Sequence, residues 1–183
     1  MRYLRAVSMA FSMYSRLPMP WVRWSDDCRA WVLCAFPLVG AVLGLLLLAW
    51  SALADLLTLT PQLRAAGAVL LPLAYTGGIH MDGFCDTCDA LASHQDRARK
   101  LEILKDSRVG AFAVLGCVSY LLLQYALWCQ PGWEKEDLWA LALVPVLSRA
   151  TSGYGALTQP GARADGLLAA FTEQEQGRGR QRF

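Results

Sequence analysis

The sequence predicts an all-α protein: a polytopic membrane helix bundle with about four transmembrane helices and a cytoplasmic helical loop. Of its 183 residues, 55% are hydrophobic and only 17% are charged, which is more apolar than an ordinary soluble domain of this length. The charged residues are also clustered, because none occurs in residues 30–54 or in residues 109–133. Each of these runs exceeds the roughly 20 residues that a helix needs to cross a bilayer.

The first segment, residues 1–20, mixes apolar side chains with arginines and has Pro18 and Pro20 at its end. Proline removes a backbone donor and clashes with the preceding turn, so a helix in this segment should stop before Pro18. A segment of this mixed character is expected to lie in the membrane interface.

Four apolar runs are predicted to span the membrane, at about residues 31–54, 65–81, 109–133 and 138–157. The first contains Gly40 and Gly44, whose spacing is typical of closely packed helices. The second is short, at about 25 Å if wholly helical, and would deliver Asp82 at or just inside the membrane surface. The fourth is interrupted only by Arg149. We expect residues 1–171 to form one membrane-embedded domain and the polar residues 172–183 to form a disordered tail.

The distribution of lysine and arginine predicts the orientation in the membrane. Five arginines lie in residues 1–30, five basic residues lie in residues 97–108, and four arginines lie in the tail, whereas the intervening loops each hold one basic residue. The positive-inside rule then places the N-terminus, the loop after the second span and the tail in the cytoplasm, as expected for a multi-pass protein of the cell inner (cytoplasmic) membrane. No basic patch with interleaved aromatics indicates nucleic-acid binding.

Three aspartates follow the second span. On a helix, Asp82, Asp86 and Asp89 stand at i, i+4 and i+7 and therefore share one face. Like charges this close repel one another, so we expect a cation among them, and oxygen ligands beside a phosphate-bearing substrate favour Mg²⁺. Acidic residues that complement a helix dipole would explain one or two of these aspartates, but not three in register.

Residues 91–106 lack glycine and proline and predict a second, cytoplasmic helix. Glu102 and Asp106 would share a face and could complete a site for one or two Mg²⁺ ions, while Lys105 and Arg108 could bind phosphate oxygens. The alternative is an ordinary solvated charged face.

His80 and Arg149 are further candidates. On an unbroken helix His80 would point about 160° away from Asp82, so only a break near Gly77 and Gly78, or at Gly83, would turn it into the site. Arg149 lies inside an apolar run, where an arginine usually faces a polar cavity, and we predict that it contacts phosphate; the alternative is that it reaches the interface from a helix end.

Six cysteines raise the possibility of a zinc site. Cys85, Cys88 and His80 offer three ligands, but the sequence has no second C-x-x-C pair. Thiols on a cytoplasmic face also stay reduced, so we interpret the cysteines mainly as small apolar side chains.

Two long motifs make the chain resemble cobalamin synthase, the adenosylcobinamide-GDP ribazoletransferase family of polytopic membrane proteins. They are T-G-G-I-H-M-D-G-F-C-D-T-C-D at residues 76–89 and L-E-I-L-K-D-S-R-V-G-A-F at residues 101–112, and weaker similarity extends over residues 1–171. Ala90 and Leu168 stand where the family usually has glycine. The family also normally continues through further apolar spans, so the chain looks C-terminally shortened.

The resemblance implies a Mg²⁺-dependent reaction that joins α-ribazole, or its 5′-phosphate, to adenosylcobinamide-GDP with loss of GMP. Asp82, Asp86 and Asp89 would then bind the metal, with Glu102 or Asp106 completing its shell. Asp106 or His80 would serve as the base, and Lys105, Arg108 and Arg149 would hold the GDP phosphates. Association with itself or with other cobalamin-pathway enzymes is also expected.

Two other functions stay open on the sequence. One is a different Mg²⁺-dependent membrane transferase, of the phospholipid-headgroup or prenyl type. The other is a transport or binding fragment, which would distribute acidic residues through several spans rather than at one cytoplasmic edge.

Overall fold

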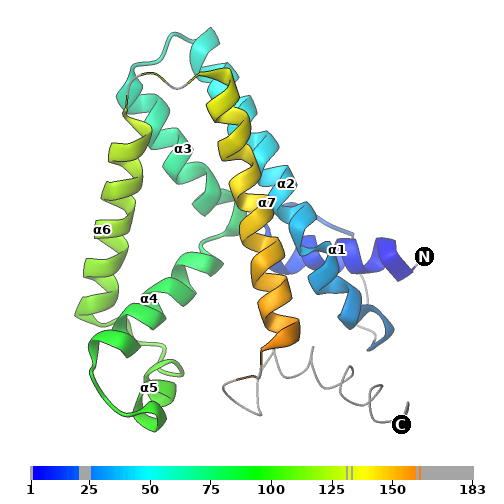
Figure 1. Cartoon of the computed structure of the whole chain (residues 1–183), viewed down its shortest axis with the longest axis vertical. Helices are drawn as coiled ribbons and strands as arrows, with labels where there is room; N and C mark the ends of the chain where they lie inside the picture. The colour runs from blue at the N-terminus through cyan, green and yellow to red at the C-terminus, as the bar shows by residue number, and fades with distance from the viewer. Residues whose placement is uncertain (1, 21–25, 131, 133, 160, 162–183) are drawn as a thin grey trace. The chain divides into compact units, whose positions relative to one another are not determined.

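The structure, a computed structural model, describes residues 2–20, 26–130, 132, 134–159 and 161. These residues form seven helices and no strands, which confirms the all-α prediction (Figure 1). The chain divides into two compact units, one of residues 1–48 and 134–183 and the other of residues 49–133. The helices are α1 (Arg2–Tyr14), α2 (Asp26–Leu56), α3 (Pro61–Thr76), α4 (Ile79–Ala92), α5 (Arg97–Ile103), α6 (Ala111–Trp128) and α7 (Lys135–Thr158).

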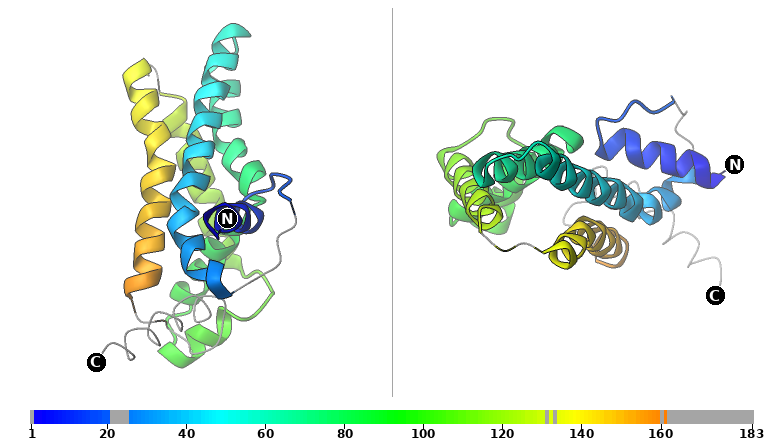
Figure 2. Two further views of the ribbon diagram at one scale, coloured as in Figure 1. Left: turned by 90° about the vertical axis from the view of Figure 1, so that its right-hand side faces the viewer. Right: turned by 90° about the horizontal axis from the view of Figure 1, so that it is seen from above.

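The first unit contains α1, α7 and the first part of α2. Helices α2 and α7 lie side by side (Figures 1 and 2). A side chain on Gly40 would collide with the carbonyl of Pro145, and one on Gly44 would collide with the carbonyl of Ala142. The two glycines therefore form the close-packing face that their spacing predicts.

Helix α1 buries one face against α2. Its buried residues Ala6, Met9 and Ala10 recur at helical spacing, while Tyr3 and Leu4 are exposed. The Tyr14 ring lies 4.3 Å from that of Phe36, measured between centroids. The helix ends at Tyr14, as expected for a helix that stops before Pro18, and its place in the membrane interface stays a prediction.

The second unit contains the end of α2 and helices α3 to α6. Trp50 joins α2 to α3, because its indole donates to the Arg64 carbonyl at 2.9 Å and its ring fills the space beside Gly67. Helix α6 packs against both α3 and α4, and α5 packs against α4. The acidic helix α4 is therefore held by α6 and α5 together.

Two consecutive glycines separate α3 from α4. Gly77 and Gly78 both have positive φ, at 66° and 80°, a conformation that side chains with a Cβ strongly disfavour. The Gly77 amide also donates to the Leu73 carbonyl, which closes the end of α3. The apolar run 65–81 is thus not wholly helical, and α4 begins in a new direction at Ile79.

Among the residues that the structure describes, two helices are long and apolar enough to cross a membrane by length and composition, namely the Trp31–Leu56 part of α2 and the whole of α6. Helix α6 exposes many large apolar side chains, including Val114, Leu115 and Val118, as lipid-facing helices do. Helix α6 is shorter than the predicted span 109–133, and α7 contains the predicted span 138–157. The membrane class fits these helices, the count of four spans stays a prediction, and the predicted tail 172–183 lies outside the described residues.

Candidate active site

The three aspartates of the first motif occupy one helix, as predicted. Helix α4 runs without interruption from Ile79 to Ala92 and so keeps Asp82, Asp86 and Asp89 on one face. Asp82 is exposed, whereas Asp86 and Asp89 are half-buried. The pKa of Asp86 is raised above its ordinary value, first by burial and then by the negative charges of Asp82 and Asp89. The carboxylates thus form an acidic face on which each charge disfavours the others.

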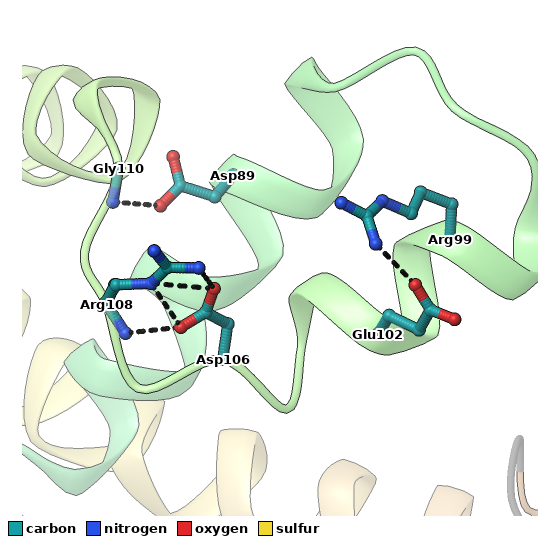
Figure 3. A network of polar contacts seen from close by, with 6 residues as sticks. All are labelled: Asp89, Arg99, Glu102, Asp106, Arg108 and Gly110. Carbon is teal, nitrogen blue, oxygen red and sulfur yellow. Dashed lines mark hydrogen bonds and ion pairs between the residues drawn. The ribbon is translucent and has the colours of Figure 1, made fainter.

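Asp89 connects this face to the second motif. Its carboxylate accepts a hydrogen bond from the Gly110 amide at 2.7 Å (Figure 3). It accepts another from the Ala113 amide at 2.8 Å. Gly110 is the N-cap of α6, and it has no side chain that could bind the first amides of the helix. Asp89 therefore caps α6 from a different helix, and its negative charge lies at the positive end of the α6 dipole.

The close approach explains why residue 110 is glycine. A Cβ on Gly110 would lie 2.6 Å from Asp89 Oδ1, well inside van der Waals contact. Further along the same interface, Cys88 lies against Gly116, and the Phe84 and Tyr120 rings are 5.3 Å apart between centroids. The contact between α4 and α6 thus extends over several turns beyond the cap.

The single helix predicted for residues 91–106 is wrong. Helix α4 ends at Ala92, His94 has a positive φ of 50°, and α5 covers only Arg97–Ile103. Two polar side chains stabilise the break: Ser93 bonds back to the Ala90 carbonyl at 2.7 Å, and Asp96 accepts from the Arg99 amide at 2.9 Å as the N-cap of α5. The run Ser-His-Gln-Asp was the sequence signal for this break, because it holds cap-forming residues without glycine or proline.

The break changes the geometry of the second acidic pair. Glu102 lies on α5 and pairs with Arg99 at 2.6 Å, whereas Asp106 lies beyond the end of α5. The two carboxylates therefore do not share a helix face, contrary to the expectation for a continuous helix. Figure 3 shows Glu102 directed at Arg99, away from Asp89 and Asp106.

Asp106 and Arg108 form the most extensive polar contact of this region (Figure 3). The Arg108 guanidinium donates to Asp106 Oδ2 at 2.7 Å through Nη2 and to Oδ1 at 3.0 Å through Nε, and the Arg108 amide donates to Oδ1 at 3.0 Å. These hydrogen bonds lower the pKa of Asp106 to about 2. The Arg108 side chain is nevertheless 88% exposed, so its guanidinium is accessible to a ligand.

The other predicted site residues are His80, Lys105 and Arg149. His80 is exposed in the first turn of α4. The glycine break precedes both His80 and Asp82, so the two residues share one continuous helix and point in directions about 160° apart. Lys105 is exposed just beyond α5. Arg149 lies in α7, in the other unit, so its distance from the acidic face is not fixed and its contact with phosphate stays a prediction.

The carboxylate oxygens of this region are of the kind that binds Mg²⁺, but they are not arranged around one point. Within the described part of the chain, no group of three or more histidine, cysteine or acidic side chains is arranged to hold a metal ion. Asp89 already binds two amides, and Glu102 and Asp106 already pair with arginines. Asp86, in contrast, is a partly buried carboxylate whose raised pKa a nearby cation would relieve, and carboxylate oxygens are the ligands that Mg²⁺ prefers.

Comparison with known proteins shows the family to which this chain belongs. The family model described as cobalamin-5-phosphate synthase matches residues 6–182. A protein of Lachnoclostridium phytofermentans is 38% identical over 173 residues, which cover 94% of this chain and 66% of the relative. A protein of Clostridium perfringens strain 13 is 33% identical over 171 residues, or 93% of this chain and 68% of the relative.

A third relative, from Halalkalibacterium halodurans, is 39% identical over 152 residues, which cover 80% of this chain and 57% of that protein. All three relatives are named adenosylcobinamide-GDP ribazoletransferase. This chain spans about two thirds of the length of the first two. No solved structure matches it.

Proposed function

Because this chain belongs to the cobalamin-5-phosphate synthase family, we propose that it is a membrane transferase of cobalamin biosynthesis. The reaction is the transfer of the adenosylcobinamide phosphate group from adenosylcobinamide-GDP to α-ribazole, or to its 5′-phosphate, with release of GMP. The observation that carries the proposal is the juxtaposition of two motifs: Asp89 ties the acidic face of α4 to the segment that holds Asp106 and Arg108. In the proposed site, carboxylates of α4 would bind the cation and the Arg108 guanidinium would bind phosphate.

The reaction makes one bond to phosphorus and breaks another. A hydroxyl of α-ribazole attacks the phosphorus that carries the cobinamide, the bond to the bridging oxygen breaks, and GMP leaves with that oxygen. The hydroxyl proton passes to a base on the protein. When bound, Mg²⁺ would neutralise the diphosphate and the charge that develops on the departing GMP.

The metal would be held mainly by Asp82 and Asp86. Both lie on the acidic face of α4, and the raised pKa of Asp86 indicates a carboxylate whose charge lacks compensation. Glu102 would reach such an ion only after leaving Arg99. The acidic face therefore supplies the first ligands, and the diphosphate oxygens supply others.

Arg108 and Asp106 would act as a linked pair. With a pKa of about 2, Asp106 is a poor base at neutral pH, because its proton affinity is too low. If Arg108 turns to a substrate phosphate, Asp106 loses the hydrogen bonds that lower its pKa and becomes more basic. Phosphate binding would thus prepare the base, with His80 the alternative proton acceptor and Lys105 and Arg149 as further phosphate ligands.

The proposal is tested with purified protein in lipid vesicles containing Mg²⁺, adenosylcobinamide-GDP and either α-ribazole or its 5′-phosphate. GMP and a completed corrinoid should appear in equal amounts, and the Asp86→Asn variant should form neither. Asp96→Asn is the matched control, because asparagine caps α5 as well as aspartate does. GMP release without a completed corrinoid, or no turnover with either acceptor, contradicts the proposal.

A further inference from the structure

The cap of α6 is provided from outside the helix, unlike the caps of α3 and α5. Helices α3 and α5 are capped by the side chains of their own N-cap residues, Thr60 and Asp96. Helix α6 has glycine at this position, and the bonds to its first amides come from Asp89, which precedes Gly110 by 21 residues. A local serine or aspartate would cap the helix equally well, so capping alone does not explain the use of a distant carboxylate.

The distant carboxylate also fixes the position of the segment that precedes α6. Gly110 follows Arg108 by two residues, so the two bonds to Asp89 fix one end of the segment 106–110 against α4. The acidic face and the Asp106–Arg108 pair are thereby held at a fixed separation. The glycine at 110 is required for this approach, since any Cβ would meet the Asp89 carboxylate.

We propose that Asp89 is a positioning residue, which fixes the Asp106–Arg108 segment against the acidic face and does not itself bind the metal. The inference rests on the proposed function and assigns different roles to the three aspartates of α4. Asp82 and Asp86 serve the cation, and Asp89 sets the distance between that cation and the phosphate-binding arginine. Both Asp89 oxygens are committed to main-chain donors for this purpose.

A pair of variants separates positioning from capping. Asp89→Ala removes both the cap and the connection to α4. Adding Gly110→Ser to Asp89→Ala gives α6 a cap of its own, because the backbone of residue 110 is extended, as an N-cap should be, and alanine at 89 leaves room for the new side chain. The double variant should therefore regain thermal stability and slow amide exchange at residues 112 and 113, whose amides a serine at 110 can bond, yet keep the turnover defect of Asp89→Ala.

The expected loss is in kcat, by about 10- to 100-fold in both variants, since a displacement of about 1 Å has an effect of that order. Amide exchange at residues 110 and 113, whose amides bond Asp89, should be about tenfold faster in Asp89→Ala than in the wild type. Exchange at residue 113 should return towards wild type in the double variant. Gly155→Ala is the matched glycine control, because a Cβ there meets no atom within 4 Å.

Metal binding is measured without turnover, from the loss of the free Mn²⁺ signal in electron paramagnetic resonance. The Asp89→Ala and double variants should bind Mn²⁺ within about twofold of wild type, whereas Asp86→Asn should bind it at least about tenfold more weakly. Equal weakening in Asp89→Ala and Asp86→Asn would make Asp89 a ligand and overturn the inference. Full recovery of kcat in the double variant would show that Asp89 acts only as a helix cap, and this result would also overturn the inference.

Gly110→Ala tests the same contact from its other side, with the Asp89 carboxylate intact. It should lower kcat and speed exchange at residues 110–113, because the new Cβ displaces Asp89. Unchanged exchange and unchanged kcat in this variant contradict the inference. If the wild type releases no GMP, the proposed function fails, while exchange and Mn²⁺ binding still decide whether Asp89 connects the two motifs.

Discussion

Asp86 has surroundings that poorly suit a negative charge. Burial and the charges of Asp82 and Asp89 all raise its pKa, and none of these effects contributes to folding. A residue that destabilises the folded protein is most simply explained by a ligand that compensates it. A cation bound at the proposed site would compensate these charges.

This residue-scale conclusion predicts that Asp86→Asn stabilises the protein when Mg²⁺ is absent. Removing two like-charge contacts should add about 0.4 to 1 kcal/mol, or roughly 1 to 4 °C in Tm. Because the pKa of Asp86 is raised on folding, its penalty exists at neutral pH and vanishes below about pH 4, where the carboxyl is protonated in both states.

The measurement is thermal unfolding of the detergent-purified protein with a chelator, at pH 7 and near pH 4. Asp96→Asn serves as the control for loss of one carboxylate. Mg²⁺ should then raise the Tm of the wild type more than that of Asp86→Asn. A lower Tm for Asp86→Asn at pH 7 would show that the acidic face is not under electrostatic strain.

The sequence predicts that the three aspartates share a helix face, but it does not predict the contact between Asp89 and α6. Their register follows from helix periodicity, which is a local property, so the shared face of Asp82, Asp86 and Asp89 was predictable. The bond from Asp89 to Gly110 joins residues 21 apart and depends on how α6 returns to α4. No local pattern contains that information, although a helix that starts with an uncapped glycine is a signal to look for a distant cap.

At the scale of elements, one of the two breaks around α4 is readily predicted from the sequence and the other is not. The break at Gly77 and Gly78 is indicated by composition, because adjacent glycines interrupt helices. The break at Ser93–Asp96 depends on side-chain hydrogen bonds that compete with the helix, and it was missed. A segment without glycine and proline is thus not necessarily one helix. Cap-forming residues inside it are the stronger evidence, and they indicate a break.

The glycine break predicts a backbone effect that is free of packing effects. A Cβ at Gly78 meets no atom within 4 Å, yet its φ is 80°, so Gly78→Ala should destabilise by about 1 to 2 kcal/mol through conformation alone. Gly78→Asn should destabilise less, because asparagine tolerates the left-handed region.

Chemical unfolding, followed by Trp50 fluorescence in a chain whose six other tryptophans are replaced by phenylalanine, checks this order of stability. The matched control is Gly83→Ala, which also meets no atom but lies inside α4 and should be stabilising by about 0.5 to 1 kcal/mol. Equal effects of alanine at 78 and 83 would contradict the proposed role of the positive φ.

At the scale of the whole molecule, composition was the most reliable guide. Runs without charge predicted the apolar helices, and α2 and α6 have the length and hydropathy to cross a bilayer. The number of spans was harder to predict, because α3 has 16 residues and α7 contains Arg149, and such helices cross a membrane only with support from their neighbours. Those contacts depend on tertiary packing, which hydropathy does not describe.

The orientation predicted by the positive-inside rule is testable with single cysteines. In a chain whose six native cysteines are replaced by alanine, Thr58→Cys lies between α2 and α3, and Gln95→Cys lies between α4 and α5. A membrane-impermeant maleimide should label residue 58 in intact cells and residue 95 only after permeabilisation. Labelling in the reverse pattern would place the acidic face outside the cytoplasm and remove it from the nucleotide substrate.

Helix α4 is fixed to α6 by Asp89 and also by Cys88 and Phe84, so most of its length is held against that helix. A rise of about 1.5 Å per residue places Asp86 about 4.5 Å and Asp82 about 10 Å from Asp89 along the helix axis. Asp82 therefore lies beyond Phe84, outside these contacts, and a rearrangement around a bound cation would be greatest at Asp82.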